Sequence, residues 1–146
     1  MTADTGTYVL ILRCDTAARL RIGRWGALDA RPGYYAYVGS AFGPGGVRAR
    51  VTRHARRGKA MHWHVDYLRD HAALVSVWYA HSDTRLEHEW AEALAGLAGM
   101  EPVNGFGCSD CRCGSHLFFS PARPALERFR RVALGTVAVW RPDEAV

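Results

Sequence analysis

Lysine is almost absent from this sequence, and so are long runs of apolar residues. Lys59 is the only lysine, so arginine supplies the rest of the 19 basic residues. No stretch of about 18 apolar residues occurs, which excludes a membrane-spanning helix. Residues 1–6 are polar and lack the apolar segment of a signal peptide. We therefore expect a cytoplasmic protein that does not associate with membranes.

Acidic residues are missing between Ala30 and Val65. Seven basic residues lie in this window: Arg31, Arg48, Arg50, Arg53, Arg56, Arg57 and Lys59. Such a local excess of positive charge attracts a polyanion, and guanidinium groups match phosphate oxygens in pairs. A GC-rich genome also favours arginine over lysine, so the argument depends on the acid-free window and not on the arginine content. This window predicts contact with nucleic acid.

Cysteine is scarce and unevenly spread. Cys14 stands alone, and the other three lie between positions 108 and 113. Secreted disulfide scaffolds distribute their cysteines along the chain. Zinc accepts three Cys and one His, and Cys108, Cys111, Cys113 and His116 offer that ligand set. Zinc sites usually join two separated ligand pairs, so a disulfide or packed free thiols stay open as alternatives.

The apolar patterns predict one small domain over residues 1–146. Strands are expected at 6–13, 19–24, 34–40, 73–80, 117–119 and 136–140, and helices at 46–57, 62–71, 84–98 and 122–134. Residues 99–116 are rich in Gly, Pro, Asn, Ser and Cys and are expected to form a long ordered loop. The fold class is therefore α/β (α+β), with a mainly antiparallel central sheet flanked by helices and strand 6–13 near its centre.

Two tripeptides lie on the expected strands, Gly6-Thr7-Tyr8 and Tyr37-Val38-Gly39. A glycine-rich turn and a helix follow, and the helix carries Arg50 four residues before His54. Each piece alone is common, but their order resembles the GIY-YIG nuclease family. The segments GTYVLIL, GYYAYVGSA, MHWHVDYL and GFGCSDCRCGSHLFF make the chain most similar to the small stand-alone Uri-type (DUF123) group of that family.

The resemblance implies the GIY-YIG nuclease fold and metal-dependent hydrolysis of phosphodiester bonds. Tyr8 and Tyr37 are separated by 28 residues, more than in typical members. An extra hairpin over residues 19–33, placed at a sheet edge, would account for the difference. We expect DNA rather than RNA as the substrate, and single-stranded, branched and damaged DNA all stay open.

The resemblance also assigns catalytic roles. Tyr8 would help to remove a proton from the attacking water, and Tyr37 would position water or phosphate. Arg50 would stabilise the charge that develops on the phosphoryl group. His54, on the same helix face as Arg50, would contact phosphate or move a proton.

A glutamate on a later helix would bind Mg²⁺, or Mn²⁺ in vitro. Helical periodicity does not choose between Glu87 and Glu89. The family's glutamate is commonly followed by apolar residues three and four positions later. Trp90 and Ala91 meet this pattern for Glu87, so Glu87 is preferred and Glu89 is held in reserve.

Several residues near the catalytic helix are expected to bind nucleic acid: Arg48, Arg53, Arg57, Lys59 and Trp63. Trp63 would either stack on an unpaired base or anchor the core. His62 and Asp66 share a helix face at a spacing of four residues. They would form either a second metal-binding pair or part of a hydrogen-bonded polar junction.

Two other functions fit the same sequence. One is a nucleic-acid-binding module without turnover, and the other is a zinc-stabilised interaction subunit. The sequence shows no separate DNA-targeting domain. Specificity would therefore come from the small domain itself, a homodimer or a protein partner.

Overall fold

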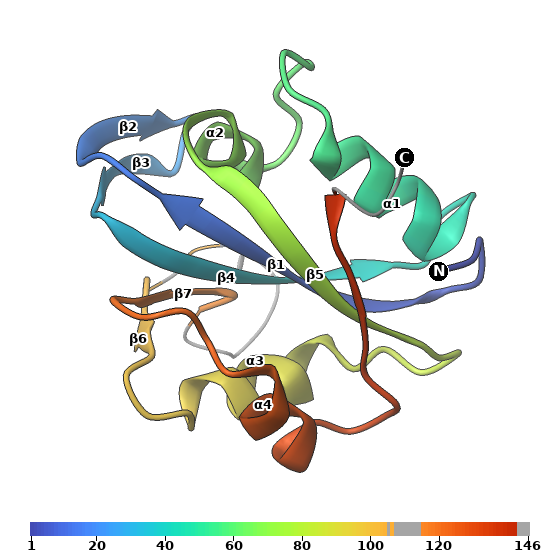
Figure 1. Ribbon diagram of the computed structural model, residues 1–146. Helices are drawn as coiled ribbons and strands as arrows, with labels where there is room; N and C mark the ends of the chain where they lie inside the picture. Colours follow the sequence, from blue (N-terminus) through green and yellow to red (C-terminus); the bar gives the residue numbers. More distant parts are fainter. Residues whose placement is uncertain (105, 107–114, 143–146) are drawn as a thin grey trace.

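The computed structural model describes residues 1–104, 106 and 115–142, arranged around one twisted sheet (Figure 1). Among these residues the main sheet has six strands in the order β6-β7-β4-β1-β5-β8, and every pairing is antiparallel. The strands are β1 (Gly6–Cys14), β4 (Gly33–Ala41), β5 (Ala73–His81), β6 (Glu101–Pro102), β7 (Leu117–Ser120) and β8 (Ala138–Trp140). The predicted antiparallel sheet with β1 inside it is confirmed.

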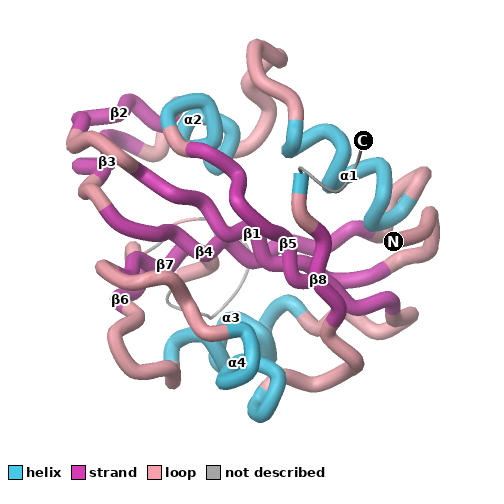
Figure 2. Tube along the Cα trace, in the orientation of Figure 1, coloured by secondary structure: helices cyan, strands magenta, loops and turns pink. Residues whose placement is uncertain are grey.

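Helices cover both faces of this sheet. Figure 2 shows α1 (Gly46–Ala55) and α2 (His64–His71) on one side, and α3 (Glu87–Ala95) and α4 (Leu126–Val132) on the other. Alternate residues of β1 point to opposite faces of the sheet. Leu10 and Leu12 pack in the core beneath α1 and α2, whereas Val9 and Ile11 pack in the core beneath α3 and α4. Burial on both faces explains why β1 is almost continuously apolar.

The inserted hairpin does not join the main sheet. Strands β2 (Ala18–Ile22) and β3 (Gly26–Ala30) pair only with each other in the described structure, and β2 packs against α2. The prediction that this hairpin lies at a sheet edge is therefore wrong. The physical reason is burial of apolar side chains: packed on α2, the hairpin places Ile22 and Leu28 in the α1–α2 core.

Helix boundaries also differ from the sequence pattern. Helix α1 ends at Ala55, two residues before its predicted end, and the buried Arg69 of α2 donates to the carbonyls of His54 and Ala55 at 2.8 and 2.9 Å. Helix α3 begins at Glu87 rather than near residue 84. Within the described part of the chain, no helix combines the length and apolarity needed to cross a membrane.

Candidate active site at the open end of β4

Strand β4 is flanked by two strands along only part of its length. Strand β7 pairs with it from Tyr34 to Tyr37, and the last backbone bond on that side joins Val38 N–H to the His116 carbonyl at 2.9 Å. Among the described residues, 39–41 pair with β1 alone. We call this segment the open end of β4. Helix α1 packs on β4 from one face and α3 from the other, so side chains of both helices can meet there.

The two tripeptide glycines each permit a close approach. Gly39 lies opposite Tyr8 in the β1–β4 register, and a Cβ on Gly39 would stand 2.5 Å from the Tyr8 phenol oxygen. A Cβ on Gly6 would stand 2.2 Å from the Ala80 carbonyl oxygen and 2.8 Å from Val47. Only glycine fits at either place. Gly39 therefore lets the Tyr8 hydroxyl lie against the open end of β4.

Tyr8 and His54 form a buried pair at this point. The Tyr8 hydroxyl lies 2.9 Å from His54 Nε2, and the two side chains are 2% and 0% exposed. Burial raises the pKa of Tyr8 from 10.0 to about 12, although the Arg50 cation opposes the change. Burial likewise lowers the pKa of His54 from 6.5 to about 3, opposed by the Asp66 carboxylate. Both groups are neutral near pH 7.

Asp66 is the anchor of the polar junction behind His54. It is fully buried and receives both guanidinium nitrogens of Arg53, at 3.0 and 2.9 Å, and the backbone N–H groups of His62 and Trp63. Burial disfavours its charge, but these hydrogen bonds outweigh burial and lower the pKa of Asp66 from 3.8 to about 2. Of the two roles expected for His62 and Asp66, the contacts match the polar junction.

Arg50 spans the open end of β4. Its guanidinium donates to the Ser40 carbonyl at 3.0 Å and lies 4.4 Å from the centre of the Trp63 ring. Arg53 contacts the same ring at 4.2 Å. Cation–π contacts of this kind stabilise by about 0.5–2 kcal/mol. Trp63 therefore packs against two arginine side chains and against the hydrophobic core, and it stabilises the positions of both arginines.

Glu87 approaches the open end of β4 from the opposite layer. The Ser40 hydroxyl donates to Glu87 Oε1 at 2.6 Å, and His116 Nδ1 lies 3.2 Å from Oε2. The Glu87 side chain is 24% exposed. Glu89 is exposed and sits two residues further along α3, about 200° around the helix axis. Glu87 rather than Glu89 faces Ser40 and His116.

His116, one of the four expected zinc ligands, lies in the described part of the chain. It is 3% exposed and lies beside Glu87, and burial lowers its pKa while the Glu87 carboxylate opposes that change. The other three proposed zinc ligands, Cys108, Cys111 and Cys113, lie outside the described residues. The zinc prediction is therefore untested.

Tyr37 borders the site from β4 and is partly buried. Its ring packs edge-on against Phe106 at 6.3 Å, and Phe106 also contacts Trp25 of the hairpin turn and His64. Burial raises the pKa of Tyr37 well above its ordinary value of 10.0. Its hydroxyl is therefore a neutral hydrogen-bonding group that can orient water or phosphate but does not ionise near pH 7.

The carboxylate of Glu87 suits a hard divalent cation. Mg²⁺ is usually held by one or two carboxylates, several waters and substrate phosphates. Within residues 1–104, 106 and 115–142, no group of three or more His, Cys, Asp or Glu side chains is arranged to hold a metal. The Glu87 carboxylate, with His116 beside it, is chemically suited to contribute one ligand to such a cation.

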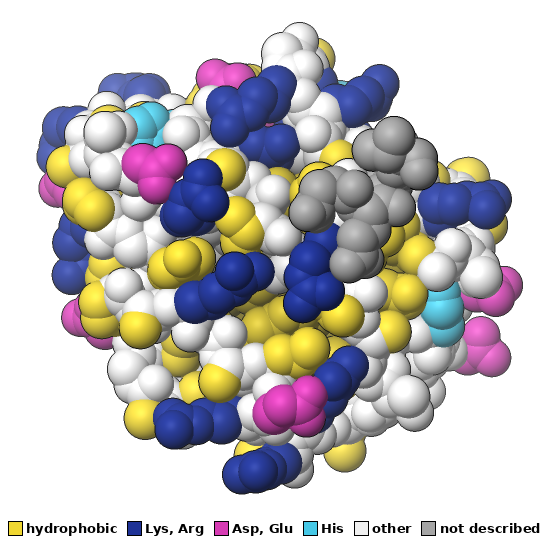
Figure 3. Space-filling model, in the orientation of Figure 1, with side chains coloured by type: hydrophobic (Ala, Val, Ile, Leu, Met, Phe, Trp, Pro, Cys, Tyr) yellow, Lys and Arg dark blue, Asp and Glu magenta, His cyan; other side chains and the backbone are white. Residues whose placement is uncertain are grey.

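The basic side chains expected to bind nucleic acid differ in exposure and in their hydrogen bonds. Arg48 is exposed on α1, whereas Arg57 and Lys59 donate to backbone carbonyls. A cavity of about 200 Å³ is lined by Arg50, Arg53 and the small residues Gly43, Pro44, Gly46 and Ala49. Figure 3 shows basic side chains spread over the visible face of the molecule. The cavity therefore places the Arg50 guanidinium beside a glycine-rich turn, and the Arg53 guanidinium, which is paired with Asp66, lines it as well.

The structure brings Tyr8, Tyr37, Arg50, His54 and Glu87 to one region, as the sequence predicts. Sequence reasoning missed Ser40, which bridges Arg50 through its carbonyl and Glu87 through its hydroxyl. Its position directly after Tyr37-Val38-Gly39 is the signal that could have identified it. The contact of Asp66 with His54 carried no such local signal.

Comparison with known families gives one match. The family described as "Domain of unknown function DUF123" matches residues 7–137, which is most of the chain. No curated protein matches the chain, and no solved structure does.

Proposed function

Because the chain belongs to the DUF123 family, whose description assigns no activity, we propose a function from its site: metal-dependent endonuclease activity that hydrolyses phosphodiester bonds in DNA. The observation that carries this proposal is the meeting of three functional groups at the open end of β4. These are a tyrosine–histidine pair, an arginine and a glutamate, from β1, α1 and α3. We also propose that the fold is that of the GIY-YIG nucleases, whose two tripeptides and helix motif the chain resembles.

The Tyr8–His54 pair would handle the proton of the attacking water. His54 is fully buried and bonded to Tyr8, so contact with phosphate is the less suitable of its two expected roles. Neutral His54 can accept the Tyr8 proton while the Tyr8 oxygen takes one from water. General acid–base catalysis of this kind contributes about 10²–10⁴-fold to a rate.

Arg50 would stabilise the phosphoryl charge. Its present hydrogen-bond acceptor in the site is the neutral Ser40 carbonyl, and a phosphate oxygen, being charged, is a stronger acceptor. Removing one such contact from a transition state typically costs about 3–4 kcal/mol. The basic cavity beside Arg50 would receive the neighbouring phosphates of the strand.

Glu87 would hold the divalent cation, with His116 and Ser40 orienting its two oxygens. A bound Mg²⁺ or Mn²⁺ supplies positive charge to the phosphodiester and lowers the pKa of bound water. Orientation of a metal-binding carboxylate by neighbouring hydrogen bonds is common and affects metal affinity about 10–100-fold.

A cleavage assay tests the proposal. The protein is incubated with labelled single-stranded, duplex and branched DNA, and with RNA of the same sequence, in Mg²⁺, Mn²⁺ or EDTA. We expect cleavage of DNA that requires the metal and that falls about 10²-fold or more in Arg50→Ala and Glu87→Ala proteins.

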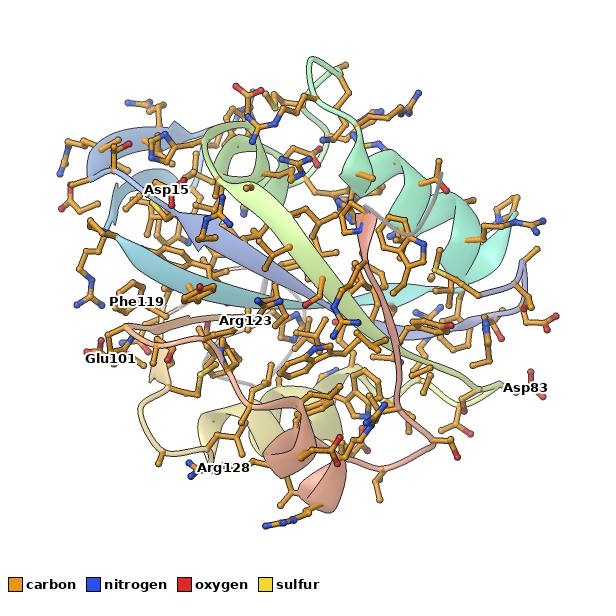
Figure 4. The ribbon with its side chains drawn as sticks, in the orientation of Figure 1. Asp15, Asp83, Glu101, Phe119, Arg123 and Arg128 are labelled. Carbon is orange, nitrogen blue, oxygen red and sulfur yellow. The ribbon has the colours of Figure 1, made fainter. Side chains whose placement is uncertain are left out.

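Matched variants separate catalysis from general loss of charge. Glu89→Ala removes an exposed carboxylate from the same helix as Glu87. Arg128→Ala removes an exposed arginine from α4, which lies on the opposite side of the sheet from Arg50 (Figure 4). Both should cleave as the wild type does. No cleavage by wild type, or equal cleavage by all four variants, would overturn the proposal. Salt-sensitive binding without cleavage would instead identify a nucleic-acid-binding module.

A further inference from the structure

A carboxylate stands behind the proposed proton acceptor. His54 uses Nε2 for Tyr8, and its other ring nitrogen, Nδ1, lies 3.9 Å from Asp66 Oδ1. Nδ1 is buried and makes no hydrogen bond within the described structure. Buried polar atoms without a partner are uncommon in proteins. No hydrogen bond at Nδ1 fixes its protonation in the described structure, so the nearby Asp66 carboxylate acts on this nitrogen through its charge.

The two carboxylate oxygens of Asp66 accept different numbers of hydrogen bonds. Oδ2 accepts from Arg53 Nη2 and from the backbone N–H groups of His62 and Trp63. Oδ1, the oxygen nearer to His54, accepts from Arg53 Nη1 and from no other donor among the described residues. A carboxylate oxygen has about two lone pairs, so Oδ1 retains an unused one. An N–H on His54 Nδ1 is attracted to this oxygen, whereas a bare Nδ1 lone pair is repelled by it.

We propose that Asp66 is a positioning residue that holds His54 in the tautomer with its proton on Nδ1, so that Nε2 accepts the hydroxyl proton of Tyr8. The other tautomer would place an N–H on Nε2, and that group would donate to the Tyr8 oxygen. Tyr8 would then have no acceptor on His54 for its own proton. Asp66 thus sets the direction in which the buried pair can move a proton.

The consequence for catalysis rests on the proposed nuclease function. The water O–H bond breaks as the water oxygen attacks phosphorus, and the released proton binds the Tyr8 oxygen. The phosphorus–oxygen bond to the leaving sugar oxygen breaks in the same displacement, and that oxygen takes a proton from solvent. The original Tyr8 O–H bond breaks, and that proton binds His54 Nε2. Among the described groups with the largest effect on His54, the Asp66 carboxylate favours the imidazolium, and the cations Arg50, Arg53 and Lys59 oppose it. Asp66 therefore favours the proton on His54.

The tautomer can be measured without substrate. Long-range ¹H–¹⁵N correlation spectra of ¹⁵N-histidine-labelled protein near pH 7.5 distinguish a protonated Nδ1 from a protonated Nε2. We expect wild-type His54 to carry its proton on Nδ1. In Asp66→Asn protein the proton should move to Nε2 in a large fraction of molecules. The rate of DNA cleavage should fall about 10²-fold without a matching rise in KM.

Arg53→Gln is the matched control, because it breaks the same ion pair but leaves the carboxylate facing His54. It should retain the proton on Nδ1. A wild-type proton on Nε2, an unchanged tautomer in Asp66→Asn, or the same change in both variants would overturn the proposal. If Asp66→Asn does not fold, the wild-type spectrum alone decides. Absence of cleavage by wild type would refute the nuclease and leave the tautomer result standing.

Discussion

Acid should destabilise this fold through His54, because the folded chain holds that ring uncharged. Burial lowers the pKa of His54 from 6.5 to about 3, whereas the unfolded chain exposes the ring to water. Between these two values the unfolded chain binds one more proton than the folded chain. The free energy of unfolding is therefore fully retained above pH 6.5 and decreases as the pH falls toward 3.

The expected loss is large enough to measure. Proton linkage with these two pKa values gives a loss of roughly 2 kcal/mol from His54 between about pH 8 and about pH 5. Domains of this size are stable by about 5–15 kcal/mol. Asp66 contributes in the same direction only at lower pH, because its stabilisation is present above 3.8 and is lost as the pH falls toward 2.

Urea unfolding followed by tryptophan fluorescence at about pH 8, 6.5 and 5 measures this loss. In His54→Gln protein an amide that does not titrate replaces the ring, so its stability should depend less on pH by roughly 2 kcal/mol over the same range. Comparing each protein with itself at different pH cancels the fixed cost of the substitution. His62→Gln removes an exposed histidine and serves as the control. Equal pH dependence in wild type and His54→Gln would refute the reasoning.

Three further perturbations act on other parts of the site. Gly39→Ala should destabilise the fold by about 1–3 kcal/mol in urea, because the new methyl group displaces the Tyr8 ring, and DNA cleavage should fall with it. Arg69→Ala should lower stability by ~3 kcal/mol in the same assay, since it removes charge-assisted hydrogen bonds from the carbonyl end of α1. His116→Ala should weaken Mn²⁺ binding about tenfold in calorimetry, because Glu87 loses the partner of one oxygen. Unchanged values in these measurements would contradict the assigned contacts.

The strands that bear the two tripeptides were predictable because their information is local. Continuous apolar residues mark β1 as a strand buried on both faces, and the glycine-rich turn marks the start of α1. The sequence also correctly predicted that Tyr8 lies on a strand and that Arg50 and His54 lie on a helix. It did not state that Gly39 lies opposite Tyr8, because strand register depends on pairing across the sheet.

Contacts between helices and strands that are distant in the sequence were harder to predict. Glu87 and Ser40 are 47 positions apart and meet only because α3 crosses β4 where β7 has ended. The hairpin carried a clear strand signal, yet its place on α2 depends on the burial of Ile22 and Leu28 against a helix distant in the sequence. Periodicity left Glu87 and Glu89 equivalent, whereas the packing of α3 distinguishes them by exposure.

The proposed site divides into a fixed part and an exchangeable part, and this division explains why two neighbouring arginines differ. Arg53 is paired with a buried carboxylate through two hydrogen bonds and is 16% exposed, so moving it toward a phosphate would leave Asp66 buried and uncompensated. That cost is about 3–5 kcal/mol. Arg50 donates to the neutral Ser40 carbonyl, which a charged phosphate oxygen can replace with a gain in hydrogen-bond strength. Arg50 can therefore exchange its acceptor for a substrate phosphate, while Arg53 stays paired with Asp66.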